Sequence, residues 1–349
     1  MKIKTKIILF LGFVCLLYSC TKTEFEGPSI STLYGDFEII EPLKITNINP
    51  SFSNNEQVGF HCEFNKPVEW KIAITGLNTG AIREITGFSN IIDSNVVVWN
   101  GGPSQVPFFS EEACNVELTF ENETDTLRDS ITIISSKNYG NGVWFEDFEN
   151  GLPADALVYY NPDGGGMTFS LANDNALLGS SYFKMGGRVN WDWALGNLDM
   201  PINIANITQN PDDLFINIGL LSDLQDLHTG QFINILISEE TNTPFNDNLN
   251  NNASDLFEST MEVYKMRVDV DWEGWQLKSF RYSDFEPVSS NNQTINFNMN
   301  PNDIKAIRIT CLACPSSSGN PVCPENFGKD VRTDIDHIVF TLNTNLLDQ

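Results

Sequence analysis

The segment DWEGWQLKSFRYSDF, residues 271–285, decides how we interpret the fold of the C-terminal half of the chain. Trp272 and Trp275 stand three residues apart, Gly274 between them suits a turn, and the run after Trp275 indicates a strand followed by a second turn. Such a tryptophan pair forms either a platform for a ligand or part of a hydrophobic core. The sequence on both sides of the segment decides between these roles.

Short strands separated by turn residues recur before and after this segment, and no amphipathic stretch of helical length stands out. The clearest predicted strands of the N-terminal half are residues 58–64, 68–74, 95–99, 114–120 and 127–133. Regular short strands of this kind are typical of β-sandwiches. We therefore expect an all-β chain, and its 349 residues suggest two domains.

A cysteine, a tryptophan and a second cysteine mark the first of these domains. The order of Cys62, Trp70 and Cys114 resembles the Cys…Trp…Cys arrangement of immunoglobulin-like domains. The interval from Cys62 to Trp70 is shorter than in antibody domains, so the resemblance extends only to an Ig-like β-sandwich. It implies a disulfide between Cys62 and Cys114.

A polar, glycine-containing segment at residues 137–142 is the predicted linker between the domains. It separates an Ig-like domain at residues 37–136 from a second domain at residues 143–346.

The second domain opens with VWFEDFENG at residues 143–151 and closes with TDIDHIVF at residues 333–340. Together with the intervening strands, these segments resemble the galactose-binding-like β-jelly-roll carbohydrate-binding modules, particularly those related to family 11. The matching strand-turn and closing positions are Trp275, Phe280, Ser283, Asp284, Phe285, Ile335, Asp336, Ile338 and Phe340. Arg281 departs from the proline usual in that pattern, and residues 241–260 form an Asn-rich insertion.

This resemblance implies that Trp275 starts a core strand, which leaves Trp272 in a turn at the rim. A better sugar platform is Trp191 with Trp193, because residues two apart on a strand point to the same face. Aromatic rings stack on the apolar face of a pyranose, and charged groups bind its hydroxyls. The predicted carbohydrate-binding residues are Arg188, Trp191, Trp193, Arg267 and Asp269. The alternatives are a tryptophan pair that faces the sheet interior and a merely solvated Arg267–Asp269 face.

The same resemblance implies a structural Ca²⁺ between the first and last strands of the second domain. By position, Asp147, Glu149 and Asp336 match its ligands, and Asp174 is a possible addition. Hard carboxylate oxygens suit this ion. An ordinary acidic surface is the alternative.

Three further cysteines follow late in the chain. In an exported protein, pairing is the default for cysteines. We expect Cys314 to pair with Cys323 across the Pro/Ser/Gly loop, whereas Cys311 alternates with Ile307 and Ile309 and is expected to be buried and free. A zinc site is the alternative, and it would need a fourth ligand such as His337.

The N-terminus reads MKIKTKIILFLGFVCLLYSC, with three lysines before the apolar run Ile7 to Leu17. The run is too short to cross a bilayer, which takes about 20 residues, but it fits a secretory signal. The ending LYSC resembles the lipobox of bacterial lipoproteins. This implies a signal peptide at residues 1–19, acylation of Cys20, a tether at residues 20–36 and anchoring in the outer membrane, facing the cell surface or the periplasm. An ordinary signal peptide is the alternative.

The formal charge of −26 disfavours nucleic acids and anionic lipids as partners, so we expect membrane contact only through the lipid anchor. The sequence contains no G-x-S-x-G, phosphate-binding glycine loop or two-histidine metal motif. We therefore expect a non-catalytic surface lipoprotein that binds a neutral glycan and works with an outer-membrane uptake complex. An adhesion or structural protein is the alternative, and a divergent glycoside hydrolase is the third.

Overall fold

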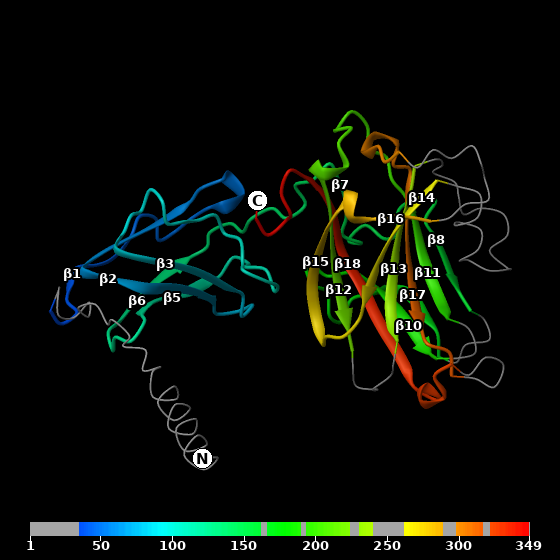
Figure 1. Ribbon diagram of the computed structural model, residues 1–349, viewed down its shortest axis with the longest axis horizontal. Helices are drawn as coiled ribbons and strands as arrows, with labels where there is room; N and C mark the ends of the chain where they lie inside the picture. The colour runs from blue at the N-terminus through cyan, green and yellow to red at the C-terminus, as the bar shows by residue number, and fades with distance from the viewer. Residues whose placement is uncertain are drawn as a thin grey trace, which may run out of the picture.

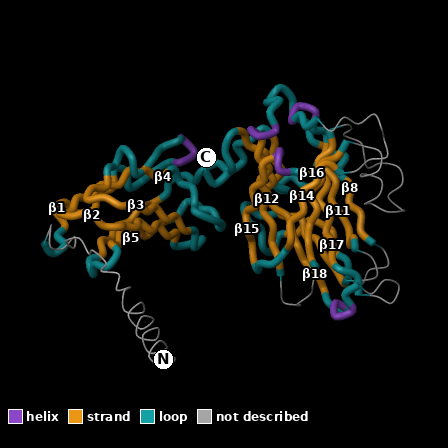
Figure 2. Tube along the Cα trace, in the orientation of Figure 1, coloured by secondary structure: helices purple, strands orange, loops and turns teal. Residues whose placement is uncertain are grey.

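The computed structural model describes residues 35–161, 166–189, 193–223, 230–239, 262–288, 298–316 and 322–348 (Figure 1). The predicted signal peptide, Cys20, Trp191 and the Asn-rich insertion lie outside the described residues. The all-β prediction is confirmed, because the described chain consists of strands, loops and short 3-10 turns (Figure 2). No helix in the described part is long and apolar enough to cross a membrane.

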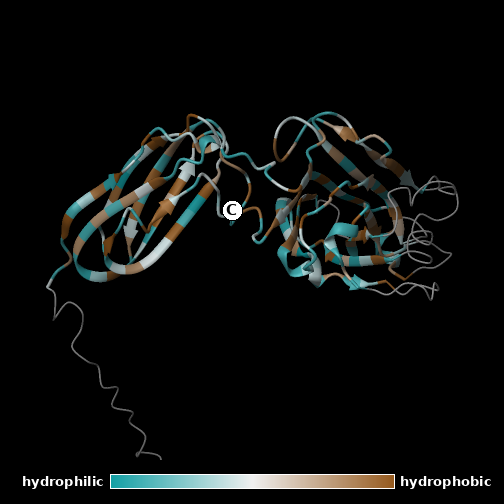
Figure 3. Ribbon diagram, turned by 90° about the horizontal axis from the view of Figure 1, so that it is seen from above, coloured by the Kyte–Doolittle hydropathy of each residue, from teal (hydrophilic) through white to brown (hydrophobic). Residues whose placement is uncertain are grey.

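The first half of the described chain forms an antiparallel sheet around the long strand β2. Its strand order is β1-β2-β5-β6, and β3 and β4 also pair with β2. Apolar and polar residues alternate along these strands (Figure 3), so one face buries a core that includes Trp70 and Trp99. The strands are β1 (Ile39–Ile45), β2 (Val58–Gly76), β3 (Ile82–Ile92), β4 (Val98–Trp99), β5 (Ala113–Phe120) and β6 (Thr126–Thr132).

Strand β2 corrects the prediction of two separate strands at residues 58–64 and 68–74. The chain continues as one strand through Pro67, and the pairing with β3 shifts register between Glu63 and Val68. Proline has no N–H to donate to a sheet, which explains an irregularity at this point.

The predicted disulfide between Cys62 and Cys114 is wrong, because both cysteines are free and buried. Cys114 pairs with Gly76 at the end of β2, whereas Cys62 lies near the beginning of the same strand. At about 3.3 Å per residue, roughly 45 Å of strand separates Cys62 from Gly76. A disulfide requires Cα atoms within about 7 Å of each other.

The second half folds into two antiparallel sheets that pack face to face. The junction sheet has the order β15-β12-β18-β10-β9, with β7 paired to β18, and the distal sheet has the order β16-β14-β13-β17-β11-β8. The strands are β7 (Trp144–Glu146), β8 (Leu157–Tyr160), β9 (Thr168–Ala172), β10 (Tyr182–Arg188), β11 (Ala194–Pro201), β12 (Leu214–Ser222), β13 (Gln231–Ser238), β14 (Val263–Asp269), β15 (Gly274–Arg281), β16 (Glu286–Pro287), β17 (Ala306–Ala313) and β18 (Asp330–Leu342). The described 3-10 turns are η1 (Phe52–Asn54), η2 (Pro211–Asp213), η3 (Tyr282–Asp284), η4 (Pro301–Asp303) and η5 (Pro324–Asn326).

The core of the second half lies between these sheets. Ile233, Ile235 and Ile237 of β13 are fully buried there, because alternate residues of a strand point to the same face. Each such side chain contributes about 1.5–3 kcal/mol through removal from water. The face of β13 that carries Phe232 and Asn234 therefore points away from the core.

Trp272 and Trp275 stand where predicted, in a turn and at the start of β15, but their burial is the reverse of the prediction. Trp272 belongs to the core, is 7% exposed, and donates a hydrogen bond from Nε1 to the Gly274 carbonyl (3.1 Å). Trp275 is only partly buried, and its Nε1 donates to the Asn175 carbonyl (2.8 Å). Local spacing does not reveal this, because a turn residue can fold back into the core.

The two halves meet in a small apolar cluster, which we call the junction cluster. It consists of Phe108, Tyr139, Leu177, Val339 and Leu346. The Tyr139 hydroxyl donates to the Gly101 carbonyl (3.1 Å), and the Tyr139 carbonyl lies 3.0 Å from Nε2 of His337. The segment between the halves is thus held by packing and hydrogen bonds on both sides.

The late cysteines follow their predicted pattern. Cys314 and Cys323 form a disulfide with a Cα–Cα distance of 5.7 Å, and Cys311 is free and fully buried. Burial raises the pKa of the Cys311 thiol to about 12. Burial likewise raises the pKa of Cys114 to about 12 and that of Cys62 to about 11.

These thiols should therefore be unreactive while the protein is folded. We expect Cys62, Cys114 and Cys311 to resist a thiol reagent such as DTNB at pH 8, because they are both buried and protonated. In guanidinium chloride without reductant, all of them should react, while Cys314 and Cys323 stay paired. Mass spectrometry after alkylation provides the count, and a Cys62–Cys114 cross-linked peptide would contradict the structure.

Candidate functional site

The outer face of the distal sheet, turned away from the core, gathers most of the predicted sugar-binding residues. Its register places Asn197, Thr310, Asn234 and Arg267 side by side on four neighbouring strands. Directly opposed residues of an antiparallel sheet share a face, so these four form a polar row across β11, β17, β13 and β14.

A second row of the same face contains a buried ion pair. Nε and Nη2 of Arg308 donate to Oδ1 and Oδ2 of Asp199, both at 2.8 Å, and the two side chains are 2% and 0% exposed. Asn197 Nδ2 adds a third bond to Asp199 Oδ1 (2.8 Å). Burial raises the pKa of Asp199, and the bidentate contact with Arg308 opposes that rise. This pair is therefore a structural element beneath the surface and not a ligand contact.

The accessible end of the face carries what we call the Trp193 cluster, made of Trp193, Phe232, Arg267 and Asp269. Trp193 is 37% exposed, and its ring centroid lies 6.1 Å from that of Phe232. The guanidinium carbon of Arg267 lies 3.8 Å from the Phe232 ring centroid, and Arg267 Nε donates to Asp269 Oδ1 (2.8 Å). An exposed indole and an arginine held by a carboxylate thus both contact or approach Phe232.

The structure divides the predicted sugar-binding set. It brings Trp193, Arg267 and Asp269 around Phe232, whereas Trp191 lies outside the described residues. Arg188 ends β10 of the other sheet, where it pairs with Asp330 at 3.5 Å on an exposed surface. Arg188 therefore lies on a different sheet from Arg267 and Asp269.

Phe232 is a member of the site that was not among the predicted residues. In the segment GQFINILISEE, residues 230–240, Phe232 is out of phase with Ile233, Ile235 and Ile237. Because alternate residues of a strand point to opposite faces, Phe232 lies on the outer face. A large aromatic residue on the face opposite the buried isoleucines is the sequence signal that indicates a role for Phe232 in the site.

The predicted calcium ligands hold a turn of the chain. Asp336 Oδ2 accepts hydrogen bonds from the backbone N–H groups of Leu177 (2.8 Å) and Leu178 (3.1 Å). Glu149 Oε1 accepts from the N–H groups of Ser180 (2.6 Å) and Ser181 (2.7 Å). Backbone N–H donors compete with a cation for such oxygens.

Within the described ranges, no group of three or more acidic, His or Cys residues is arranged to hold a metal. Asp147 Oδ1 instead accepts the N–H of Glu149 (3.2 Å). Asp174 accepts from the Tyr182 hydroxyl and lies 3.6 Å from Lys184 Nζ. These carboxylate oxygens accept hydrogen bonds from the chain itself, Asp336 Oδ1 is buried without a hydrogen-bond partner among the described residues, and calcium binding stays a prediction.

A buried carboxylate pair lies at the opposite end of the distal sheet. Glu239 accepts from the Tyr282 hydroxyl and the Asn300 N–H, both at 2.7 Å, and Glu262 accepts from the Tyr264 hydroxyl at 2.7 Å. Both glutamates are 9% exposed. Burial, followed by smaller effects of neighbouring groups, raises the pKa of Glu239 to about 7. These glutamates thus bind tyrosines, and neither lines a described cavity.

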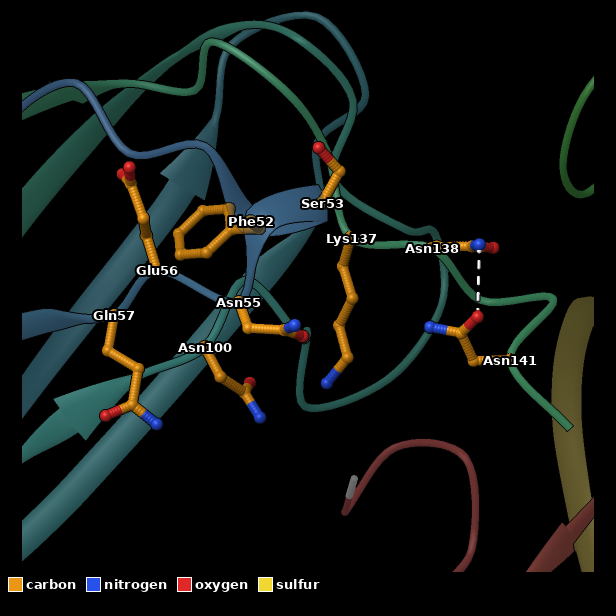
Figure 4. Close-up of a pocket in the computed structure, with 9 residues that line it drawn as sticks. All are labelled: Phe52, Ser53, Asn55, Glu56, Gln57, Asn100, Lys137, Asn138 and Asn141. Atoms are coloured by element: carbon orange, nitrogen blue, oxygen red, sulfur yellow. Dashed lines mark hydrogen bonds between the residues drawn. The ribbon is translucent and has the colours of Figure 1, made fainter.

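One cavity of about 230 Å³ lies where the first half of the chain meets the linker (Figure 4). Lys137 extends into it, near the amide side chains of Asn55 and Asn100. Burial, and to a lesser degree the charge of Arg83, lowers the pKa of Lys137. The one aromatic residue in its described lining, Phe52, is almost fully buried, so this cavity offers no ring for a sugar to stack on.

Searches with the sequence found no matching family model and no matching curated protein. Solved structures with weak likeness include SGBP-B from a complex xyloglucan utilization locus in Bacteroides uniformis, with 10% identity, coverage of 86% of this chain and 73% of that chain, and a TM-score of 0.35. The K1 cleaved adhesin domain of Lys-gingipain from Porphyromonas gingivalis has 12% identity, coverages of 58% and 98%, and a TM-score of 0.32. The CBM22-1–CBM22-2 tandem of Xyn10C from Paenibacillus barcinonensis has 8% identity, coverages of 88% and 94%, and a TM-score of 0.32. Likenesses at this level carry no argument about the function of this chain.

Proposed function

We propose that this chain is a non-catalytic, lipid-anchored protein of the outer membrane that binds a neutral glycan on the outer face of its distal sheet. The observation that carries the proposal is the Trp193 cluster, in which an exposed indole and an arginine paired with a carboxylate share Phe232 as their neighbour. The family resemblance of residues 143–346 supports the same class of ligand.

The chemistry of the cluster suits a pyranose. The face of Trp193 offers apolar surface to the C–H groups of a sugar, and Arg267 and Asp269 supply a donor and an acceptor for its hydroxyls. Phe232 holds the Arg267 guanidinium in place, which lowers the entropy lost on binding. Because Arg267 and Asp269 neutralise each other, the cluster as a whole favours an uncharged ligand.

The arrangement of the two halves suits presentation from an anchored end. β1 begins at the end of the first half that is remote from the second half, and the distal sheet lies on the side away from the first half (Figure 1). With a tether from Cys20, the first half acts as a spacer and the Trp193 cluster is directed away from the membrane. Delivery of the bound glycan to an uptake complex is part of this proposal.

One observation favours the adhesion alternative. Strand β3 exposes apolar side chains, including Phe88 at 63% and Ile91 at 45% exposure. Such residues suit contact with a protein. This contact would involve the first half of the chain and leaves the Trp193 cluster unused.

The test is native affinity electrophoresis of the ectodomain, residues 21–349, in gels that contain xyloglucan, β-glucan, xylan or galactan. Trp193→Ala should weaken the retardation of the protein by at least about tenfold in apparent affinity, because it removes the stacking surface. Arg267→Ala should have a similar effect.

Phe88→Ala is the matched control, because it removes an exposed aromatic side chain from the other half of the chain. The control should behave as wild type. Equal retardation of the wild-type protein and the Trp193→Ala and Arg267→Ala variants would contradict the proposed site.

A further inference from the structure

A cavity of about 370 Å³ lies between the two halves of the chain. Gln105 and Val106 of the first half form one side, and Trp275 and Gln276 of β15 form the other. Leu347, next to Leu346 of the junction cluster, also lines the cavity. The volume is within the range of small-molecule sites.

Trp275 is the aromatic residue of this cavity, and its ring is held in one orientation. Its Nε1 donates to the Asn175 carbonyl (2.8 Å), and its ring contacts the edge of Tyr182 with centroids 5.8 Å apart. The indole remains only partly buried and lines the cavity. A ring that is fixed before binding costs little entropy when a ligand stacks on it.

Both walls of the cavity are anchored in the junction cluster. Phe108, two residues after Val106, is 3% exposed, and Leu346, beside Leu347, is 1% exposed. The Leu346 N–H also donates to Asn217 Oδ1 (2.9 Å), which fixes the wall to β12. The cavity is therefore a built feature of the junction and not a chance gap between two loosely connected halves.

The polar groups of the lining match the hydroxyls of a sugar. The amide of Gln105 both donates and accepts hydrogen bonds, and Glu273 accepts them. In addition, β15 is the edge strand of its sheet, so one row of its backbone groups points outward. Of the described residues that line the cavity, one is acidic and none is basic, which disfavours an anionic ligand.

We propose that this junction cavity is a second carbohydrate-binding site, which takes a short segment of a neutral saccharide with one ring stacked on Trp275. The inference rests on the proposed function only for the class of ligand, since its residues are separate from the Trp193 cluster. With both sites on one chain, a long polysaccharide is held at two points, and its apparent affinity exceeds that of either site.

The test is isothermal titration calorimetry of the ectodomain with cellohexaose, xylohexaose and mannohexaose. We expect two binding equivalents for the recognised hexasaccharide, which fall to one in Trp275→Ala and to one in Trp193→Ala. Gln105→Ala should weaken the junction site by roughly tenfold. Gln105 pairs with Ile82 through its backbone, so Gln105→Ala should leave the fold intact. This variant tests the junction site even if Trp275→Ala does not fold.

The outcomes separate the two sites. A single equivalent that persists unchanged in Trp275→Ala and Gln105→Ala, but is lost in Trp193→Ala, overturns the junction site and leaves the proposed function standing. A single equivalent that is lost in Trp275→Ala and kept in Trp193→Ala supports the junction site and overturns the outer-face site. Absence of heat with all of these hexasaccharides overturns the junction site, whereas the outer-face site is decided by the affinity gels.

Discussion

Replacement of Arg308 by methionine is expected to lower the free energy of unfolding by about 3–5 kcal/mol, because it leaves the carboxylate of Asp199 buried without its counterion. Both donor nitrogens of Arg308 that bind Asp199 do so at 2.8 Å, and the pair is almost entirely shielded from water. Urea denaturation followed by fluorescence provides the measurement.

Two further variants distinguish the cost of an orphaned charge from the loss of contacts. The double variant Arg308→Met/Asp199→Leu removes both charges and should recover much of the lost stability, as replacement of a whole buried pair often does. Arg128→Met is the matched control, because Arg128 binds Glu117 at the same 2.8 Å but is 70% exposed. An exposed pair contributes only about 0–1 kcal/mol. Equal losses in Arg308→Met and Arg128→Met would contradict the account.

The second large effect is on the pH dependence of stability. Burial raises the pKa of Glu239 and that of Asp336 to about 7. In the window from about pH 4 to pH 7, the folded protein therefore binds more protons at these groups than the unfolded chain does, and their contribution to stability falls as the pH rises. Each group should account for roughly 1–3 kcal/mol across the window.

Glu239→Gln isolates one of these contributions. The glutamine oxygen still accepts from the Tyr282 hydroxyl and the Asn300 N–H but does not titrate. The difference in unfolding free energy between this variant and wild type should therefore shift in favour of the variant as the pH rises from 4.5 to 7.5. Glu84→Gln, on an exposed carboxylate beside Lys71, is the control. Parallel curves for wild type and Glu239→Gln would refute the raised pKa.

The alternation of apolar residues made the β architecture predictable, since a strand with one buried face repeats every two residues. The shared face of Arg267 and Asp269 on β14 followed directly from it. The Cys314–Cys323 disulfide was also predictable, because the two cysteines are near each other in sequence and their bond spans a short loop.

The errors came from interactions whose partners are distant in sequence. The register between β2 and β5 places Cys114 beside Gly76 and far from Cys62, and no local pattern reports a register. The orientation and burial of Trp275 depend on its hydrogen bond to Asn175, a hundred residues away, and on packing against the other half of the chain. Phe232 was visible in the pattern, but its function depends on a contact with Arg267 that pairing of β13 with β14 creates.

The burial of Leu346 in the junction cluster has a practical consequence for binding assays in which the protein is immobilised on a surface. Residues 343–348 run between the two halves, so a tag or linker appended after them emerges beside the Trp275 cavity (Figure 1). A protein captured on a sensor chip by that end would have one proposed site obstructed by its own attachment. Capture through the opposite end leaves both sites facing the solution and reproduces the orientation that a lipid at Cys20 would impose.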